Sequence, residues 1–252
     1  MNEFKDDIIW IIGASYGIGE ALARELHHQK AKLILSARSL DKLEALNTEL
    51  DNAHHVTKID LADRDNIEQV SQSLIKKYNI KRIICLAAIY RPRHINETDL
   101  SYTEKIVQVN LTGSLLLTYA LLPWMLAQCN VQLALCASVA GYTGLPGGQP
   151  YSSTKAAIIN FCESLHAEIG DRVDIKVINP GFVRTRMTDK NDFPMPLRIE
   201  PSLAAKQILK GLSSKAFEIH FPKAFSFSAK LLNILPYCLK LPITRMMRRK
   251  NK

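Results

Sequence analysis

Short apolar runs alternate with helical patterns along most of the 252-residue chain, and this alternation constrains the fold more than any other feature. The runs are continuous and rich in Ile, Val and Leu, as expected for strands that are covered on both faces of a sheet. They span residues 8–12, 32–36, 56–59, 82–87, 131–137, 174–178 and, more weakly, 218–221. Helical patterns span residues 17–28, 40–50, 64–78, 102–126, 151–169 and 202–212. This order predicts βαβ units and a doubly wound α/β fold, with a parallel sheet of about seven strands and helices on both faces.

A glycine-rich turn follows the first predicted strand and opens the first predicted helix. It reads Gly13-Ala14-Ser15-Tyr16-Gly17-Ile18-Gly19. Glycine permits a close approach of the backbone to a pyrophosphate, and a helix N-terminus supplies free N–H groups and a positive dipole end. A plain strand-to-helix turn is the alternative. In this context we predict a Rossmann-type sheet whose dinucleotide contacts include Gly13, Ser15, Tyr16, Gly17, Ile18 and Gly19.

The ends of the next two strands bear on the choice of cofactor. Ala37 supplies no acid for a ribose 2′-OH, whereas Arg38 supplies a cationic fork suited to a 2′-phosphate. We therefore expect NADP(H) in preference to NAD(H), and the alternative is that Arg38 is a solvated loop residue. Asp60 and Leu61 are expected near the adenine, although Asp60 could equally cap the helix that follows it.

Tyr151 and Lys155 lie four residues apart at the start of a predicted helix, so they share one face. A lysine ammonium beside a phenol lowers the phenol pKa from its ordinary value of about 10. Tyr151 is thus a candidate general acid/base near neutral pH. Ser138 lies at the end of the fifth predicted strand and Tyr151 at the start of the next predicted helix, so both could reach one carbonyl oxygen.

With these motifs in this order, residues 8–221 resemble the short-chain dehydrogenase/reductase family in its compact single-domain branch. Asn110, in Val109-Asn110-Leu111-Thr112-Gly113, and the segment Asn179-Pro180-Gly181 also match the family pattern. The resemblance implies a catalytic set of Asn110, Ser138, Tyr151 and Lys155.

The resemblance also assigns a role to each residue of this set. Ser138 hydrogen-bonds the substrate oxygen and Tyr151 exchanges its proton. Lys155 binds the nicotinamide ribose and tunes Tyr151, while Asn110 holds a water of the proton relay. The residues implied at the nicotinamide end are Pro180, Gly181, Val183 and Thr185. Independently of the resemblance, residues 183–201 follow the sixth predicted strand at the carboxyl edge of the sheet, so we expect them to form the substrate loop.

The sequence departs from the family pattern in two places. Ile12 replaces the usual Thr, and Cys85-Leu86-Ala87-Ala88 replaces Asn-Asn-Ala-Gly. Because Ala87 and Ala88 remain small, we expect the cofactor still to fit beside Ala87. Our hypothesis is an NADP(H)-dependent oxidoreductase that interconverts a carbonyl and an alcohol. The alternatives are a non-catalytic NADP(H)-sensing or scaffold protein of the same fold, and an extended-branch sugar-nucleotide enzyme, for which the chain has too few residues.

The formal net charge of +9 is concentrated at the end of the chain. Residues 219–252 hold eight bases and no acid, so the first 218 residues carry 25 bases and 24 acids. A nearly neutral body argues against nucleic-acid binding. We divide the chain into a catalytic domain, residues 1–222, and a basic amphipathic tail, residues 223–252. The tail is expected either to contact a membrane peripherally or to pack over the pocket or a second subunit.

Other features of the sequence suggest the location and the assembly state. Five widely spaced cysteines and the absence of a signal-peptide pattern favour a reducing, cytoplasmic location. The histidine pairs 27–28 and 54–55 lack a third ligand, so we expect surface residues and no metal site. By the resemblance, the helices at 102–126 and 151–169 pack against a second subunit, which implies a homo-oligomer.

Overall fold

The computed structural model describes residues 3–92, 95–128, 130–191 and 195–248. The strands are β1 (Ile8–Ile12), β2 (Lys32–Ala37), β3 (His55–Lys58), β4 (Ile80–Cys85), β5 (Val131–Cys136), β6 (Val173–Pro180) and β7 (Glu218–Phe221). The helices are α1 (Gly17–His28), α2 (Leu40–Glu49), α3 (Arg64–Lys77), α4 (Leu100–Val107), α5 (Gly113–Ala127), α6 (Tyr151–Ile169), α7 (Pro201–Leu212), α8 (Lys223–Ile234) and α9 (Tyr237–Met246). Strands and helices therefore alternate as predicted.

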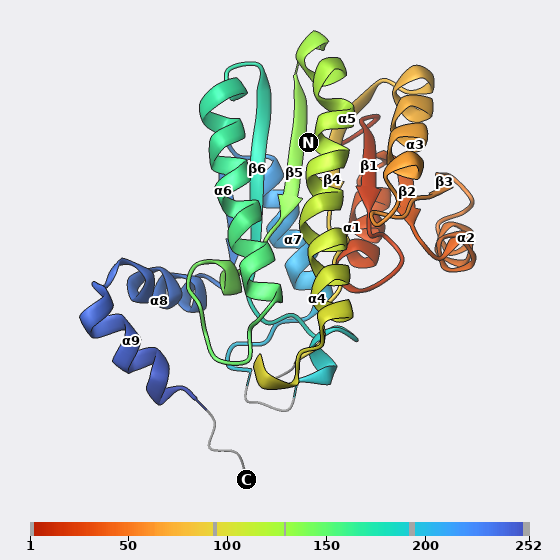
Figure 1. The fold of residues 1–252 in the computed structure, drawn as a ribbon. Coiled ribbons are helices and arrows are strands. Elements are labelled where there is room, and N and C mark those ends of the chain that lie inside the picture. Colours follow the sequence, from red (N-terminus) through yellow and green to blue (C-terminus); the bar gives the residue numbers. More distant parts are fainter. Residues whose placement is uncertain (1–2, 93–94, 129, 192–194, 249–252) are drawn as a thin grey trace.

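The seven strands form one parallel sheet in the order β3-β2-β1-β4-β5-β6-β7. This is the predicted doubly wound, Rossmann-type sheet (Figure 1). The chain proceeds outward from β1 in one direction and, after crossing back, from β4 in the other. The connections therefore diverge between β1 and β4, and a crevice opens there at the carboxyl ends of the strands.

The sheet separates two apolar cores, and β1 shows how the sequence serves both. Ile9 and Ile11 face one core, whereas Trp10 and Ile12 face the other, because successive side chains of a strand point to opposite faces. All four are fully buried. Helices α1 and α7 cover the first face and α3, α5 and α6 cover the second (Figure 1). The indole N–H of Trp10 donates to Ser36 Oγ at 2.8 Å, so the one polar atom of this buried ring is satisfied.

The helix predicted at residues 102–126 is interrupted. Helix α4 passes into a π-helical turn, Gln108–Thr112, before α5 begins. Residues Leu100–Ala127 are long and apolar enough to cross a membrane by length and composition alone. However, Leu117, Leu121 and Met125 are fully buried against the sheet, as in a core helix of a soluble fold.

The tail forms two helices that lie beside the layered body (Figure 1). Helix α8 starts directly after β7 and ends at Ile234, and Pro236 precedes α9. A proline here divides a helix because it lacks an N–H and restricts the residue before it. Pro236 thus divides the tail into two helices, whereas Pro242 lies inside α9.

The histidine pairs are less exposed than predicted: His28 is exposed, whereas His27, His54 and His55 are partly buried. His27 Nδ1 lies 3.1 Å from His54 Nε2. The second ring nitrogen of His54 accepts a hydrogen bond from the Leu33 amide at 3.3 Å. The histidines therefore join α1 to the β2–β3 edge. Within the described residues, no three His, Cys, Asp or Glu side chains are grouped so that they could hold a metal ion.

Candidate functional site

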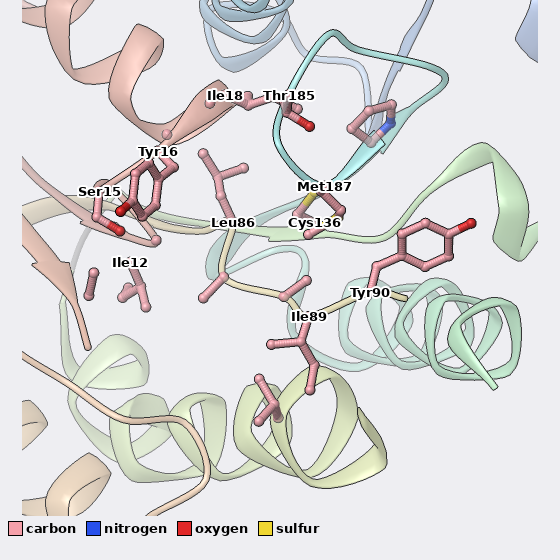
Figure 2. A pocket seen from close by; sticks show the side chains of 18 of the residues that line it. Ile12, Ser15, Tyr16, Ile18, Leu86, Ile89, Tyr90, Cys136, Thr185 and Met187 are labelled. Carbon is pink, nitrogen blue, oxygen red and sulfur yellow. The ribbon is translucent and has the colours of Figure 1, made fainter. Parts of the chain in front are cut away.

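A cavity of about 460 Å³ lies at the carboxyl ends of the strands, where the connections diverge. Figure 2 shows Ser15 and Tyr16 on one side of it, Tyr90 on the other, and Leu86 between them. Every residue predicted to contact a cofactor lines this cavity: Gly13, Ser15, Tyr16, Gly17, Ile18, Gly19, Arg38, Asp60, Leu61, Ala87, Tyr151, Lys155, Pro180, Gly181, Val183 and Thr185. Ser138 lines it as well, so the fold brings segments 170 residues apart in sequence around one space.

The glycine turn packs so closely against neighbouring main chain that side chains are excluded from it. Gly13 has φ +92° and Gly17 has φ +59°. A Cβ on Gly13 would lie 2.6 Å from Ala87 N, and one on Gly19 would lie 2.1 Å from Gly13 O. The residue that precedes α1, Tyr16, makes no side-chain capping hydrogen bond. The first-turn amides of α1 therefore receive no cap from it, which fits a helix N-terminus built to receive phosphate.

The end of the cavity beside β2 and β3 is cationic and polar. Arg38 directly follows β2, its side chain is exposed, and the described residues place no carboxylate within ion-pair distance of it. Asp60 Oδ1 accepts a hydrogen bond from the Ala62 amide at 3.0 Å. The residue that caps α3 is Asp63, whose side chain accepts from Asn66 N at 3.0 Å. The alternative that Asp60 is the helix cap is therefore wrong.

Ser138, Tyr151 and Lys155 come together at the opposite end. Helix α6 begins at Tyr151, and Lys155 lies one turn later with its Nζ 5.5 Å from the centroid of the Tyr151 ring. The Lys155 side chain is 1% exposed and donates to the main-chain oxygen of Cys136 at 2.7 Å. Ser138, at the end of β5, donates to Pro180 O at 3.3 Å and accepts from Ala140 N at 3.1 Å. Main-chain groups of β5 and β6 thus fix both polar side chains.

Burial dominates the acid–base properties of this end. It raises the pKa of the Tyr151 phenol above its ordinary value, and Cys136 adds to that rise, while a hydrogen bond with Ser138 lowers it. Burial also lowers the pKa of Lys155. The net direction for Tyr151 is opposite to that expected from Lys155, because the cost of a charged phenolate in a buried place outweighs the effect of its neighbours.

Asn110 is placed in the π-helical turn between α4 and α5, and it is not among the cavity-lining residues. Its Oδ1 accepts from Ile89 N at 2.8 Å, and its Nδ2 donates to Ile89 O at 2.9 Å. The same Nδ2 lies 3.5 Å from Thr154 Oγ1. Both polar atoms of the side chain are therefore engaged in holding the segment after β4 against α6.

Tyr90 is a cavity residue that the sequence motifs do not point to. Its ring meets that of Tyr151 edge-on, with the centroids 4.9 Å apart, and its hydroxyl donates to Asn191 Oδ1 at 2.9 Å. Tyr90 thus joins the segment after β4 to that after β6. The signal available in the sequence was its place just beyond the carboxyl end of a parallel strand, where ligands bind in such folds.

The departures from the family pattern also lie at the cavity. The Cys85 side chain is buried in the core, and burial raises its thiol pKa to about 11. Leu86 lines the cavity (Figure 2), and its amide donates to Ile12 O at 2.8 Å. The segment after β4 therefore keeps a main-chain hydrogen bond to β1, although it lacks the two asparagine side chains of the family pattern. Apolar side chains at 12 and 86 replace polar ones beside the glycine turn.

Comparisons with known proteins agree with the fold and the motifs. The family model of the short chain dehydrogenases matches residues 7–194. The 3-oxoacyl-[acyl-carrier-protein] reductase FabG of Rickettsia prowazekii is 30% identical over 182 residues, which cover 71% of this chain and 74% of that protein. Two solved structures share the fold. A short-chain dehydrogenase from Sphingobium yanoikuyae in complex with NADPH has a TM-score of 0.81 at 20% identity and 98% coverage of both chains. One from Burkholderia phymatum in complex with NAD has a TM-score of 0.82 at 17% identity, covering 100% of this chain and 99% of that one. The chain therefore belongs to the short-chain dehydrogenase/reductase family of oxidoreductases.

Proposed function

We propose that the protein is an NADP(H)-dependent oxidoreductase that interconverts a carbonyl and an alcohol. The observation that carries this proposal is the convergence of Tyr151, Ser138 and Lys155 on the cavity that also contains the glycine turn. The exclusion of side chains at Gly13 and Gly19 and the uncapped start of α1 fit a dinucleotide. When bound, the nicotinamide supplies or accepts the hydride.

The side chains of the chain itself supply binding and proton transfer. In reduction, the Ser138 hydroxyl would donate a hydrogen bond to the carbonyl oxygen, and the Tyr151 phenol would give its proton to that oxygen, while the nicotinamide would supply the hydride for the carbonyl carbon. Because burial raises the pKa of Tyr151, the phenol is protonated at neutral pH and ready to act as the acid. Lys155, held by the Cys136 carbonyl, orients the ribose and supplies a nearby cation that favours the phenolate as it forms.

Arg38 supports the preference for NADP(H). It lies on the cavity rim with no carboxylate partner among the described side chains, and the preceding Ala37 offers no acid for a free 2′-hydroxyl. Tyr90, Ile89, Leu86 and Met187 give the cavity an apolar lining (Figure 2), which supports a lipophilic substrate. Reduction is the favoured direction if NADPH is the cellular partner.

Turnover with a panel of ketones, followed at the nicotinamide absorbance band with NADPH and NADH, tests this function. Tyr151→Phe keeps the ring that contacts Tyr90 and removes the proton donor, so turnover should fall by about 10²–10⁴ while NADPH binding is kept. Tyr90→Phe is the matched control, since it removes a phenol from the other ring of the same pair. Wild-type turnover by Tyr151→Phe would overturn the mechanism. Calorimetry that shows NADPH binding without turnover of any ketone would favour the alternative, a cofactor-sensing or scaffold protein.

We also propose that residues 1–222 form the catalytic domain and residues 223–252 an appended tail. We propose a cytoplasmic location with peripheral membrane contact. We propose further that the protein forms a homo-oligomer in which the outer sides of α5 and α6 contact a second subunit. The exposed Tyr119 supports this, and its ring centroid lies 5.9 Å from that of Phe161. Sedimentation of the purified protein tests the oligomer: a monomer at all concentrations would contradict it.

A further inference from the structure

The tail helix α8 turns its polar side toward the body. Ser226 is fully buried, and its hydroxyl lies 2.6 Å from His220 Nδ1. Lys230 forms an ion pair with Glu218 of β7. The same Glu218 accepts hydrogen bonds from Asn179 Nδ2 at 2.7 Å and from the Tyr142 hydroxyl. A set of directed polar contacts thus fixes which side of α8 faces inward.

The space under the tail is lined by polar and apolar groups. A second cavity of about 360 Å³ lies between the tail and the start of α6, lined among others by Tyr142, Ser152, Asn233, Lys240 and Thr244. Thr244 of α9 is buried. Lys240 donates to the main-chain oxygen of Asn233 at 3.1 Å. The inner side of both tail helices therefore carries hydroxyl, amide and ammonium groups.

The outer side of the tail is apolar. Phe227, Leu231 and Ile234 follow a 4-3 spacing, so they form one stripe along α8. Leu239 and Met246 continue the apolar surface along α9, whereas Leu241 lines the cavity under the tail. The five outer side chains are between 54% and 78% exposed. An amphipathic helix of a soluble domain normally buries its apolar stripe, whereas α8 leaves this stripe exposed and fully buries only Ser226.

The charge around this outer surface indicates whether a second copy of the chain or a lipid bilayer fits it better. Residues 219–252 contain no acid, and the exposed bases Lys223, Arg245 and Arg248 flank the apolar stripe. The first 218 residues carry almost no net charge, so a second copy of the chain offers no excess of acids to this basic surface. An anionic bilayer offers both an apolar interior and a negative surface.

We propose that the outer faces of α8 and α9 form a docking surface for an anionic lipid membrane. Phe227, Leu231, Ile234, Leu239 and Met246 enter the interface between headgroups and acyl chains, and Lys223, Arg245 and Arg248 contact the anionic headgroups. The ion pair of Lys230 with Glu218 holds α8 in the orientation that presents the apolar stripe. Phe225 of α8 packs 5.2 Å, centroid to centroid, from Phe182, next to the cavity-lining Gly181. Docking therefore brings the active-site end of β6 close to the bilayer.

Vesicle flotation of the full chain tests the proposal without using activity. Wild type is mixed with vesicles of phosphatidylcholine and phosphatidylglycerol, and with vesicles of phosphatidylcholine alone. We expect flotation with the anionic vesicles, reduced at high salt, and much weaker flotation with the neutral ones. The triple variant Leu231→Gln, Ile234→Gln, Leu239→Gln should lose about tenfold or more in vesicle affinity, and Arg245→Gln with Arg248→Gln should lose the preference for anionic vesicles.

Matched controls separate docking from folding and from a subunit interface. Leu203→Gln changes an exposed leucine of α7, and Lys215→Gln removes an exposed base at the other end of the sheet; both should float as wild type does. Equal thermal midpoints for all variants exclude misfolding as the cause of a loss. Wild type that never floats with anionic vesicles, or a triple variant that floats unchanged, overturns the proposal. Conversion of an oligomer to a monomer by the triple variant, with no flotation of wild type, would assign the face to a second copy instead.

Discussion

The side chain of Asn110 and the main chain of Ile89 form a reciprocal pair of hydrogen bonds, 2.8 Å to Oδ1 and 2.9 Å from Nδ2. These two hydrogen bonds hold the π-helical turn against the segment that follows β4. The next residue of that segment, Tyr90, contacts the ring of Tyr151. Asn110 therefore acts on the site by positioning the wall beside Tyr151.

Replacing Asn110 by Ala should weaken both the fold and the reaction. Two buried hydrogen bonds are lost, which costs about 1–3 kcal/mol and lowers the melting temperature by roughly 2–10 °C. Because Tyr90 is released, kcat should fall more than the affinity for NADPH. Thermal unfolding and steady-state kinetics measure the two effects. Gln108→Ala, in the same turn but with one 3.4 Å bond to Ala62 O, is the control and should change both much less.

The glycine turn should tolerate no added methyl group at residue 19. A Cβ there would lie 2.1 Å from Gly13 O, so Gly19→Ala must displace main chain. We expect a loss of about 2 kcal/mol or more in the free energy of unfolding, together with weaker dinucleotide binding. Gly144→Ala adds a methyl group where no atom lies within 4 Å, and should stay within about 0.5 kcal/mol of wild type. Equal denaturation midpoints for the two variants would contradict the geometry.

Arg38→Gln should change the choice of cofactor. Loss of a charge-assisted hydrogen bond costs about 1.5–3 kcal/mol, so the dissociation constant for NADPH should rise roughly 10–150-fold. Binding of NADH, which lacks the 2′-phosphate, should be almost unchanged and serves as the internal control. Calorimetry with both cofactors measures the ratio. A wild type that already prefers NADH would refute the role given to Arg38.

His54 should make the fold less stable in mild acid. Burial, with a contribution from His27, lowers its pKa from 6.5 to about 4. Between these two values the unfolded chain binds a proton that the folded chain does not, so stability present above pH 6.5 is lost as the pH falls toward 4. Allowing for solvent screening of a half-exposed ring, the loss is about 1–2 kcal/mol.

Denaturant unfolding across this pH range tests the histidine prediction. His54→Gln should flatten the pH dependence between pH 6.5 and 4, whereas His28→Gln, at an exposed position of the same cluster, should keep the wild-type slope. The prediction fails if both variants lose stability as steeply as wild type does.

Much of the fold could be predicted because its patterns are local. The strand at Ile8–Ile12 and the helix at Tyr151–Ile169 have the predicted limits. The π-helical turn could not be predicted, since Gln108–Thr112 fits an α-helical pattern and the wider turn is stabilised by distant partners such as Ile89. The partly buried His27–His54 pair was missed for a similar reason: the two residues belong to segments that meet only in the folded sheet.

The candidate site, like the fold, could be predicted from the sequence only in part. Residues tied to strand ends, such as Arg38 and Ser138, could be placed on the cavity from their position alone. The direction of the Tyr151 pKa could not, because it depends on burial by residues from several segments. The tail shows a further limit: its amphipathic pattern predicts two faces, but only the contacts of Ser226 and Lys230 show which face is inside.

The π-helical turn changes the direction in which side chains point around the axis of the long helical segment between β4 and β5. One extra residue rotates everything before it by about 100° relative to an uninterrupted α-helix. Ile106 and Leu117, on either side of the turn, are fully buried, while Asn110 within the turn donates to the main chain of the neighbouring segment. The number of residues in this helix is therefore a constraint separate from their identity. Any chimaera that exchanges α4 or α5 with a relative must keep that count, because a single deletion would turn α4, and the loop it carries, away from the catalytic helix.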